Sequence, residues 1–165
     1  MLRLVHARAS WLRTQTQRKG RGPSEILRRA MSHDNVDLVR RATDARNAGD
    51  PSVWVGLCDP DIVLVVAPMT GPEPGTYVGT AAVVQWYTEF FRPFGRSFRV
   101  ELLETIAVGD SVIVVQRYVA RGRSSGADVQ APNVVNVVTF RAGRVIRIDN
   151  TESREAALRL VGRAV

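Results

Sequence analysis

The chain has 165 residues, 45% of them hydrophobic, which is enough apolar material for one core and too little length for two ordinary domains. Its formal net charge of +7 lies in residues 1–30, which carry eight basic side chains and one acidic, whereas residues 31–165 carry fifteen of each sign. A neutral body has no long-range field that attracts phosphates, so we expect the folded part not to bind nucleic acid.

Two residue types that often carry chemistry are scarce. Cys58 is the only cysteine, which excludes an internal disulfide and a multi-cysteine metal site. The two histidines, His6 and His33, lie in or beside the basic segment, so Cys58 lacks a histidine partner for nucleophilic catalysis. No apolar run reaches the roughly 18 to 20 residues of a membrane helix, and the N-terminus lacks the apolar region of a secretory signal. We therefore expect a cytoplasmic protein with no metal, cofactor or membrane partner.

Residues 1–30 are expected to form a disordered extension outside a domain that spans residues 31–165. The segment is rich in arginine and poor in acids, which is typical of an organelle transit peptide and of a nucleic-acid-binding arm. We favour a third interpretation, in which the start codon is assigned too early and Met31 is the true start. Met31 is followed closely by a helix start, and arginine outnumbers lysine 22 to 1, as GC-rich bacterial coding tends to produce.

The sequence of residues 34–58 predicts two helices. Asp34 is placed to cap a helix with apolar residues at helical spacing, and Asn47-Ala48-Gly49 predicts its end. Asp50-Pro51 combines a capping residue with proline at the first helical position, which predicts a short second helix over residues 52–58.

A strand, a loop and a third helix follow. Residues 62–67 are apolar and β-branched, as expected of a strand covered on both faces. The prolines and glycines of residues 68–79 predict a loop. Thr80 is expected to cap a helix that runs to about Arg92 and is ended by Pro93.

The second half alternates polar and apolar residues between turn signals, which predicts long strands followed by a short helix. The strands are expected at residues 98–108, 111–121, 129–141 and 144–151, and the helix at residues 153–161. Helices first and a meander of strands after them define an α+β fold, with a curved sheet that wraps around helices.

Five segments resemble, in order and spacing, the SnoaL-like domain of the nuclear transport factor 2-like superfamily. The resemblance covers about residues 34–161. It implies a cone-shaped, curved, mostly antiparallel sheet around three N-terminal helices, a cavity between them, and a homodimer through the outer sheet face. Members include polyketide cyclases, ketosteroid isomerases and epoxide hydrolases, so the fold does not choose an activity. The segments are Asn35 to Arg41, Asn47 to Asp50, Leu57 to Ile62, Gly75 to Gly79 and Phe140 to Ile146.

Strand alternation predicts which side chains face the cavity, because residues two apart share a face. The charged side chains Arg117, Arg121, Arg147 and Asp149 are expected to point outward, which sends Ile146, Ile148 and a set of polar groups inward. Similarity to the family implies that Asn136, Val138 and Phe140 also point inward. The expected polar groups are Gln116, Tyr118, Asn136, Asn150 and Glu152, set among Trp54, Met69, Trp86 and Tyr87. Apolar walls with a few convergent polar groups are typical of a small-molecule site.

Glu152 is the expected general acid or base, with Tyr118 and Asn136 as hydrogen-bond donors. A solvated carboxylate at a strand end is the competing interpretation of Glu152. The residues that look equivalent to the ketosteroid isomerase machinery are Val66, Ala42 and Asn136, so two of the three cannot act as acid, base or donor.

Two functions follow from these residues. The first is a protein that binds a small apolar, polyketide-like or steroid-like molecule and acts as a cofactor-free isomerase, cyclase or hydrolase. The second is a non-catalytic homodimeric module that binds a ligand or a protein, with Val135, Val137 and Thr139 supplying an apolar interface on the outer sheet face.

Overall fold

The computed structural model describes residues 22–68, 73–121, 128–130 and 132–162. Four α-helices, one 3₁₀ helix and seven strands make up this part of the chain. The helices are α1 (Pro23–Asn47), α2 (Ser52–Leu57), α3 (Thr80–Phe91), η1 (Arg92–Ser97, the 3₁₀ helix) and α4 (Arg154–Gly162). The strands are β1 (Cys58–Val66), β2 (Gly75–Val78), β3 (Arg99–Val108), β4 (Ser111–Arg121), β5 (Asp128–Gln130), β6 (Val134–Arg141) and β7 (Arg144–Thr151).

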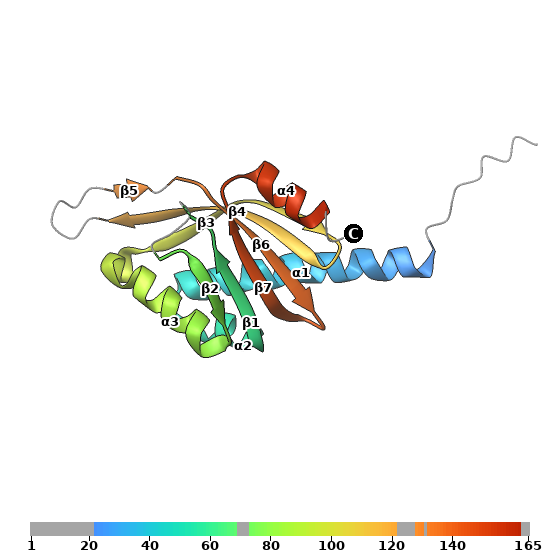
Figure 1. Ribbon diagram of the computed structural model, residues 1–165, viewed down its shortest axis with the longest axis horizontal. Helices are drawn as coiled ribbons and strands as arrows, with labels where there is room; N and C mark the ends of the chain where they lie inside the picture. Colours follow the sequence, from blue (N-terminus) through green and yellow to red (C-terminus); the bar gives the residue numbers. More distant parts are fainter. Residues whose placement is uncertain (1–21, 69–72, 122–127, 131, 163–165) are drawn as a thin grey trace, which may run out of the picture.

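The strands form one curved, unclosed sheet in the order β2-β1-β7-β6-β4-β3, with β5 paired to β4. Within the described residues the β1–β7 pair is parallel, and every other pair is antiparallel. The predicted α+β class and the mostly antiparallel sheet are therefore confirmed. Figure 1 shows α1 and α3 on one side of the sheet and α4 on the other.

We call the side that faces α1 and α3 the inner face. Its core joins Val39 of α1 and Val83 of α3 to the alternate residues Ile62, Leu64 and Val66 of β1. Each of these five side chains is at most 8% exposed. Burial of this apolar surface is the main force that holds the helices against the sheet, at about 25 cal/mol for each Å² removed from water.

Helix α1 begins earlier than predicted. It starts at Gly22-Pro23, with proline in the first turn, and Asp34 lies inside it, so the prediction of a cap at Asp34 was wrong. Residues 24–33 contain no proline or glycine, so nothing there stops a helix from continuing. The first turns project beyond the sheet, with Ile26 and Leu27 more than half exposed (Figure 1). A bond from the Ser32 hydroxyl to the carbonyl oxygen of Gly109 (3.2 Å) ties α1 to the β3–β4 turn just after the predicted boundary.

Residues 75–78, predicted as part of a loop, form strand β2 at the edge of the sheet. The prolines that argued against a strand stop at Pro74. An edge strand pairs on one side alone, so the short run Thr76-Tyr77-Val78, whose residue types favour strands, is sufficient to form one on β1. A single predicted strand over residues 129–141 is divided into β5 and β6.

The opposite, outer face is covered by α4. Ala157 and Val161 of this helix pack against Ile113, Val135 and Val137, and all five are buried. The interface expected from Val135 and Val137 is therefore filled by the chain's own C-terminal helix. The reason is that α4 itself carries an apolar stripe, and it reaches back over β4, β6 and β7. The homodimer stays a prediction.

Candidate functional site

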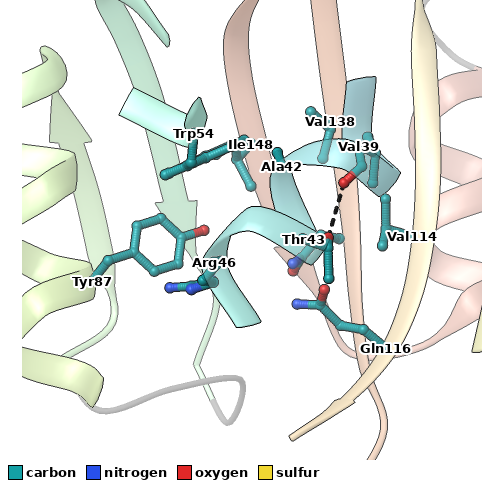
Figure 2. Close-up of a pocket in the computed structure, with 11 residues that line it drawn as sticks. Val39, Ala42, Thr43, Arg46, Trp54, Tyr87, Val114, Gln116, Val138 and Ile148 are labelled. Carbon is teal, nitrogen blue, oxygen red and sulfur yellow. Dashed lines mark hydrogen bonds between the residues drawn. The ribbon is translucent and has the colours of Figure 1, made fainter. Parts of the chain in front are cut away.

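A pocket lies between α1 and the inner face of the sheet (Figure 2). Helix α1 contributes Val39, Ala42, Thr43 and Arg46, which are spaced as one stripe along the helix. The hydroxyl of Thr43 donates to the carbonyl oxygen of Val39 (2.9 Å), so it is bonded within its own helix. The empty volume, including the part that opens to solvent, is about 550 Å³. This helix therefore forms one wall of the pocket.

The opposite wall consists of alternate residues of three neighbouring strands. Val114 and Gln116 come from β4, Asn136 and Val138 from β6, and Ile148 from β7. Alternation along the strands predicts these inner-face positions, and the structure places all five in the pocket wall. The prediction for Ile146 was wrong. A register shift pairs Thr139 with Arg147 but Phe140 with Val145, so Ile146 is an extra residue and Val145 takes the inner position.

Two aromatic rings close one end of the pocket. Trp54 from α2 and Tyr87 from α3 meet edge to face, with ring centroids 6.2 Å apart. The guanidinium of Arg46 lies 5.4 Å from the centre of the Tyr87 ring (Figure 2) and 4.0 Å from that of Phe91. Burial raises the pKa of the Tyr87 phenol far above its usual range, so this group is a neutral hydrogen-bonding group and not a base near pH 7.

The side-chain oxygens of two buried asparagines in the sheet receive no hydrogen bond from the described residues. Asn136 and Asn150 are cross-strand partners on β6 and β7, and each is 7% exposed. The Oδ1 atoms of both are buried and accept no hydrogen bond within the described part of the chain. Buried amides normally have a partner, so these two oxygens mark a place where a water or a ligand is expected to donate.

Gln116 and Tyr118 form a hydrogen-bonded pair on β4. The Gln116 amide donates to the Tyr118 hydroxyl (2.9 Å), and Gln116 lines the pocket while Tyr118 does not. The Tyr118 ring packs among Phe90, Phe91 and Phe98, at centroid distances of 5.2 to 5.8 Å. Burial raises the pKa of the Tyr118 phenol. In the structure Tyr118 holds Gln116 in place by accepting its hydrogen bond. The group of this pair that can contact a ligand in the pocket is the Gln116 amide, and not the Tyr118 hydroxyl that was predicted as a donor.

The other predicted site residues lie elsewhere. Trp86 is buried and stacks on Phe90, with centroids 5.2 Å apart, behind the pocket wall. Met69 lies outside the described residues. The expectation that Glu152 points into the pocket was wrong: β7 ends at Thr151, so alternation stops there, and Glu152 is exposed. The Thr151 hydroxyl lies within hydrogen-bond distance of the carbonyl oxygens of Val135 and Ser153, to which it can donate. These contacts lie where the chain leaves the sheet and enters α4.

Arg46 is the pocket residue that the sequence reasoning missed. Its signal was present, because Arg46 follows Val39, Ala42 and Thr43 at helical spacing and thus shares their buried stripe. An arginine on an apolar stripe is unusual, since arginine is rarely buried without a partner. The nearby turn signals at residues 47–49 predict the end of the helix and carry no information about its inner face.

Cys58 is a packed thiol. It is 4% exposed, and its Sγ donates weakly to the carbonyl oxygen of Trp54 (3.4 Å). Burial raises the pKa of the thiol to about 11, so Cys58 is protonated near neutral pH and is a poor nucleophile.

The part of the chain that the structure describes contains neither a metal-binding cluster nor a membrane-spanning helix. No cluster of three or more histidine, cysteine, aspartate or glutamate side chains there is arranged to hold a metal ion. No helix in these same residues is both long and apolar enough to cross a membrane.

Residues 39–148 match the SnoaL-like domain family. The match covers more than half of the chain and contains every pocket-lining residue, so the chain belongs to this family. No curated protein sequence matches it.

Solved structures share the fold at low sequence identity. Bal32a, from a soil-derived mobile gene cassette, is 24% identical, with a TM-score of 0.63 over 76% of this chain and 95% of its own. A proposed SnoaL-like polyketide cyclase from Jannaschia sp. CCS1 is 20% identical, with a TM-score of 0.61 over 80% of this chain and 89% of its own. TerC, co-crystallised with polyporic acid, is 19% identical, with a TM-score of 0.60 over 78% and 98%. Likeness at this level shows the fold alone.

Proposed function

We propose that this protein binds a small ring-containing molecule in the pocket between α1 and the sheet. The observation that carries the proposal is the composition of the pocket wall. It combines aliphatic side chains and two aromatic rings with the buried amides Gln116 and Asn136, and the Asn136 acceptor lacks a donor. Apolar walls fix the body of a ligand, and a few polar groups fix its orientation.

The family and its relatives favour a polyketide-like or steroid-like ligand. One structural relative is proposed to be a polyketide cyclase, and TerC was crystallised with polyporic acid. We propose for this chain the same class of ligand, which is an extended ring compound with polar substituents. The edge-to-face pair of Trp54 and Tyr87 supports this class, because aromatic side chains prefer to pack on flat ring systems.

Turnover of such a ligand, as an isomerase, cyclase or hydrolase, would need a proton acceptor. None of the pocket-lining residues in the described part of the chain is an aspartate, a glutamate or a histidine. We therefore propose ligand binding, in preference to catalysis, as the function of this pocket. A Glu152→Gln variant is expected to bind as the unchanged protein does, because Glu152 is exposed and outside the wall of the pocket.

Fluorescence and calorimetry with 1,8-dihydroxyanthraquinone test the proposal. We expect this probe to quench Trp54, and a Trp54→Phe variant to lose most of that quenching while calorimetry still detects binding. An Ala42→Phe variant places a ring in the pocket and is expected to weaken binding at least tenfold, since Ala42 is 5% exposed in the pocket wall.

The matched control is Ala48→Phe, because Ala48 lies at the end of the same helix and is exposed. It should leave the affinity unchanged. Thermal melts of both variants separate a blocked pocket from an unfolded protein. Equal binding by a folded Ala42→Phe variant, or absence of binding to the unchanged protein, would overturn the proposal.

A further inference from the structure

Arg46 places a positive charge in the pocket, and none of the described residues neutralises it. Its guanidinium is packed over the faces of Phe91 and Tyr87, and it makes no ion pair or hydrogen bond with any described residue. Of the pocket-lining residues described, it is the one that carries a charge. Its position therefore needs an explanation other than the stability of the fold.

Ring contacts compensate a buried guanidinium only in part. A cation over an aromatic face gains roughly 0.5 to 2 kcal/mol, whereas the five N–H groups of arginine lose water when the side chain is enclosed. Burial accordingly lowers the pKa of Arg46, although an arginine stays charged at any physiological pH. A charged donor that is held without an acceptor is a favourable place for an anion.

The carboxylates on the surrounding elements are engaged elsewhere or face solvent. Glu101 bonds Arg117 and Glu104 bonds Arg154 on the strands, and Glu89 accepts from Gln85 on α3. Asp44, the nearest acid along α1, is exposed. The anion that would complete the Arg46 site is thus not supplied by any of these groups.

A second polar feature lies on the sheet side of the same pocket. Asn136 lines the pocket and is more than nine-tenths buried, and its Oδ1 has no donor. Register places it between Val114 of β4 and Asn150 of β7, whose Oδ1 also has no donor. An unsatisfied buried acceptor costs roughly 1 to 3 kcal/mol, which a ligand O–H would recover.

We propose that the ligand is an organic anion: a flat ring system whose anionic oxygen pairs with Arg46 and whose hydroxyl group donates to Asn136. This inference rests on the proposed ligand-binding function and adds the charge and the hydrogen-bonding pattern of the ligand. A carboxylate and an ionised enol share the anionic oxygen that Arg46 recognises. The ring occupies the apolar space between them, against Trp54, Val138 and Ile148.

Calorimetry with three matched probes tests the charge and the hydroxyl separately. The probes are 6-hydroxy-2-naphthoate, in which the ring system separates the carboxylate from the hydroxyl, its neutral primary amide, and 2-naphthoate, which lacks the hydroxyl. We expect the hydroxynaphthoate to bind tightest, the amide about 10-fold to 100-fold more weakly, and 2-naphthoate about 5-fold to 10-fold more weakly, as the worth of a charge-assisted and a neutral hydrogen bond implies.

Variants assign these differences to residues. Arg46→Gln should abolish the preference for hydroxynaphthoate over its amide, and Arg46→Lys should restore part of it because the charge returns. Asn136→Leu should abolish the preference for hydroxynaphthoate over 2-naphthoate. The control is Arg41→Gln, which removes an exposed arginine from the same helix and should change neither preference.

The outcomes separate this inference from the proposed function. If every probe binds the unchanged protein equally and Arg46→Gln alters nothing, the pocket binds rings without regard to charge, and the anion inference is wrong while the proposed function stands. If none of the three probes binds at millimolar concentration, while thermal melts show folded protein, both are contradicted. Equal loss of all three probes in a folded Arg46→Gln variant would assign Arg46 to the shape of the pocket and contradict the charge argument.

Discussion

At the scale of single residues, the pocket is equipped to hold a ligand and poorly equipped to move protons. Arg46 is always charged, Gln116 and Asn136 do not titrate, and burial keeps the Tyr87 phenol neutral near pH 7. In such a site the ionisable group that matters belongs to the ligand. Its affinity should therefore follow the ionisation of the ligand and not that of a protein side chain.

Asn136 illustrates the conflict between binding and stability. Its buried acceptor has no partner in the described residues, so replacing it by leucine of similar size is expected to stabilise the empty protein by about 1 kcal/mol, or about 2 to 4 °C in Tm. The same change should weaken the binding of hydroxyl-bearing probes. Thermal melts without and with 6-hydroxy-2-naphthoate measure both effects.

Asn133→Leu is the matched control, because Asn133 precedes β6 and is exposed. It should shift neither the melting temperature nor the affinity. A fall in Tm for Asn136→Leu would mean that an internal water already satisfies the amide, and the site would then lack an unfilled acceptor.

At the scale of elements, the sheet carries helices on both faces, and these have different tasks. Helix α1 forms a wall of the pocket, whereas α4 covers the apolar side chains Val135 and Val137 on the outer face. The Arg154 side chain at the start of α4 also bonds Glu104 of β3 (3.0 Å) in an exposed ion pair, which contributes little stability. The apolar contacts of α4 thus hold it in place.

Ala157→Asp is expected to loosen α4 from the sheet. Ala157 is fully buried against the outer face, so a carboxylate there would be desolvated without a partner, and we expect a loss of at least about 3 kcal/mol in the free energy of unfolding. Urea denaturation measures it. Leu158→Asp, one residue further and 38% exposed, should cost less than about 1 kcal/mol. Similar losses for the two variants would contradict the docking of α4 through Ala157.

At the scale of the whole molecule, pattern and turn chemistry were sufficient to predict the fold class and most of the elements, and the resemblance of a few segments predicted the family. Local signals such as Asn47-Ala48-Gly49 and Asp50-Pro51 reflect short-range physics, which a sequence displays directly. The misplaced features depend on long-range packing. The start of α1, the edge strand β2 and the bulge at Ile146 are set by neighbours distant in the sequence.

The site was predicted in part, for the same reason. Trp54, Tyr87, Gln116 and Asn136 line the pocket, since strand and helix periodicity place them there. Arg46 was missed, because its proposed role depends on the absence of a carboxylate partner among the described residues, and that absence is a property of the folded arrangement. Glu152 was misplaced because the alternation was extended one residue past the end of β7.

A chain that begins at Met31 tests the domain boundary. The removed turns of α1 are exposed, and pocket residues begin at Val39, so we expect a melting temperature within about 3 °C of the full chain and an unchanged affinity for 6-hydroxy-2-naphthoate. A chain that begins at Arg40 is the comparison, since it also loses the buried Asn35 and Val39 and should be strongly destabilised. A large drop in Tm for the first truncation would assign residues before Met31 to the domain.

The placement of α4 also decides how the molecule can be immobilised. Because this helix ends the described chain on the side of the sheet away from α1 and α3 (Figure 1), a tether attached after it would lie on the face opposite the pocket. Coupling to a sensor surface through the C-terminus should therefore preserve ligand uptake. A chemical anchor on the exposed Asp44 of α1, which is next to the pocket residue Thr43 in the sequence, is instead expected to obstruct ligand uptake.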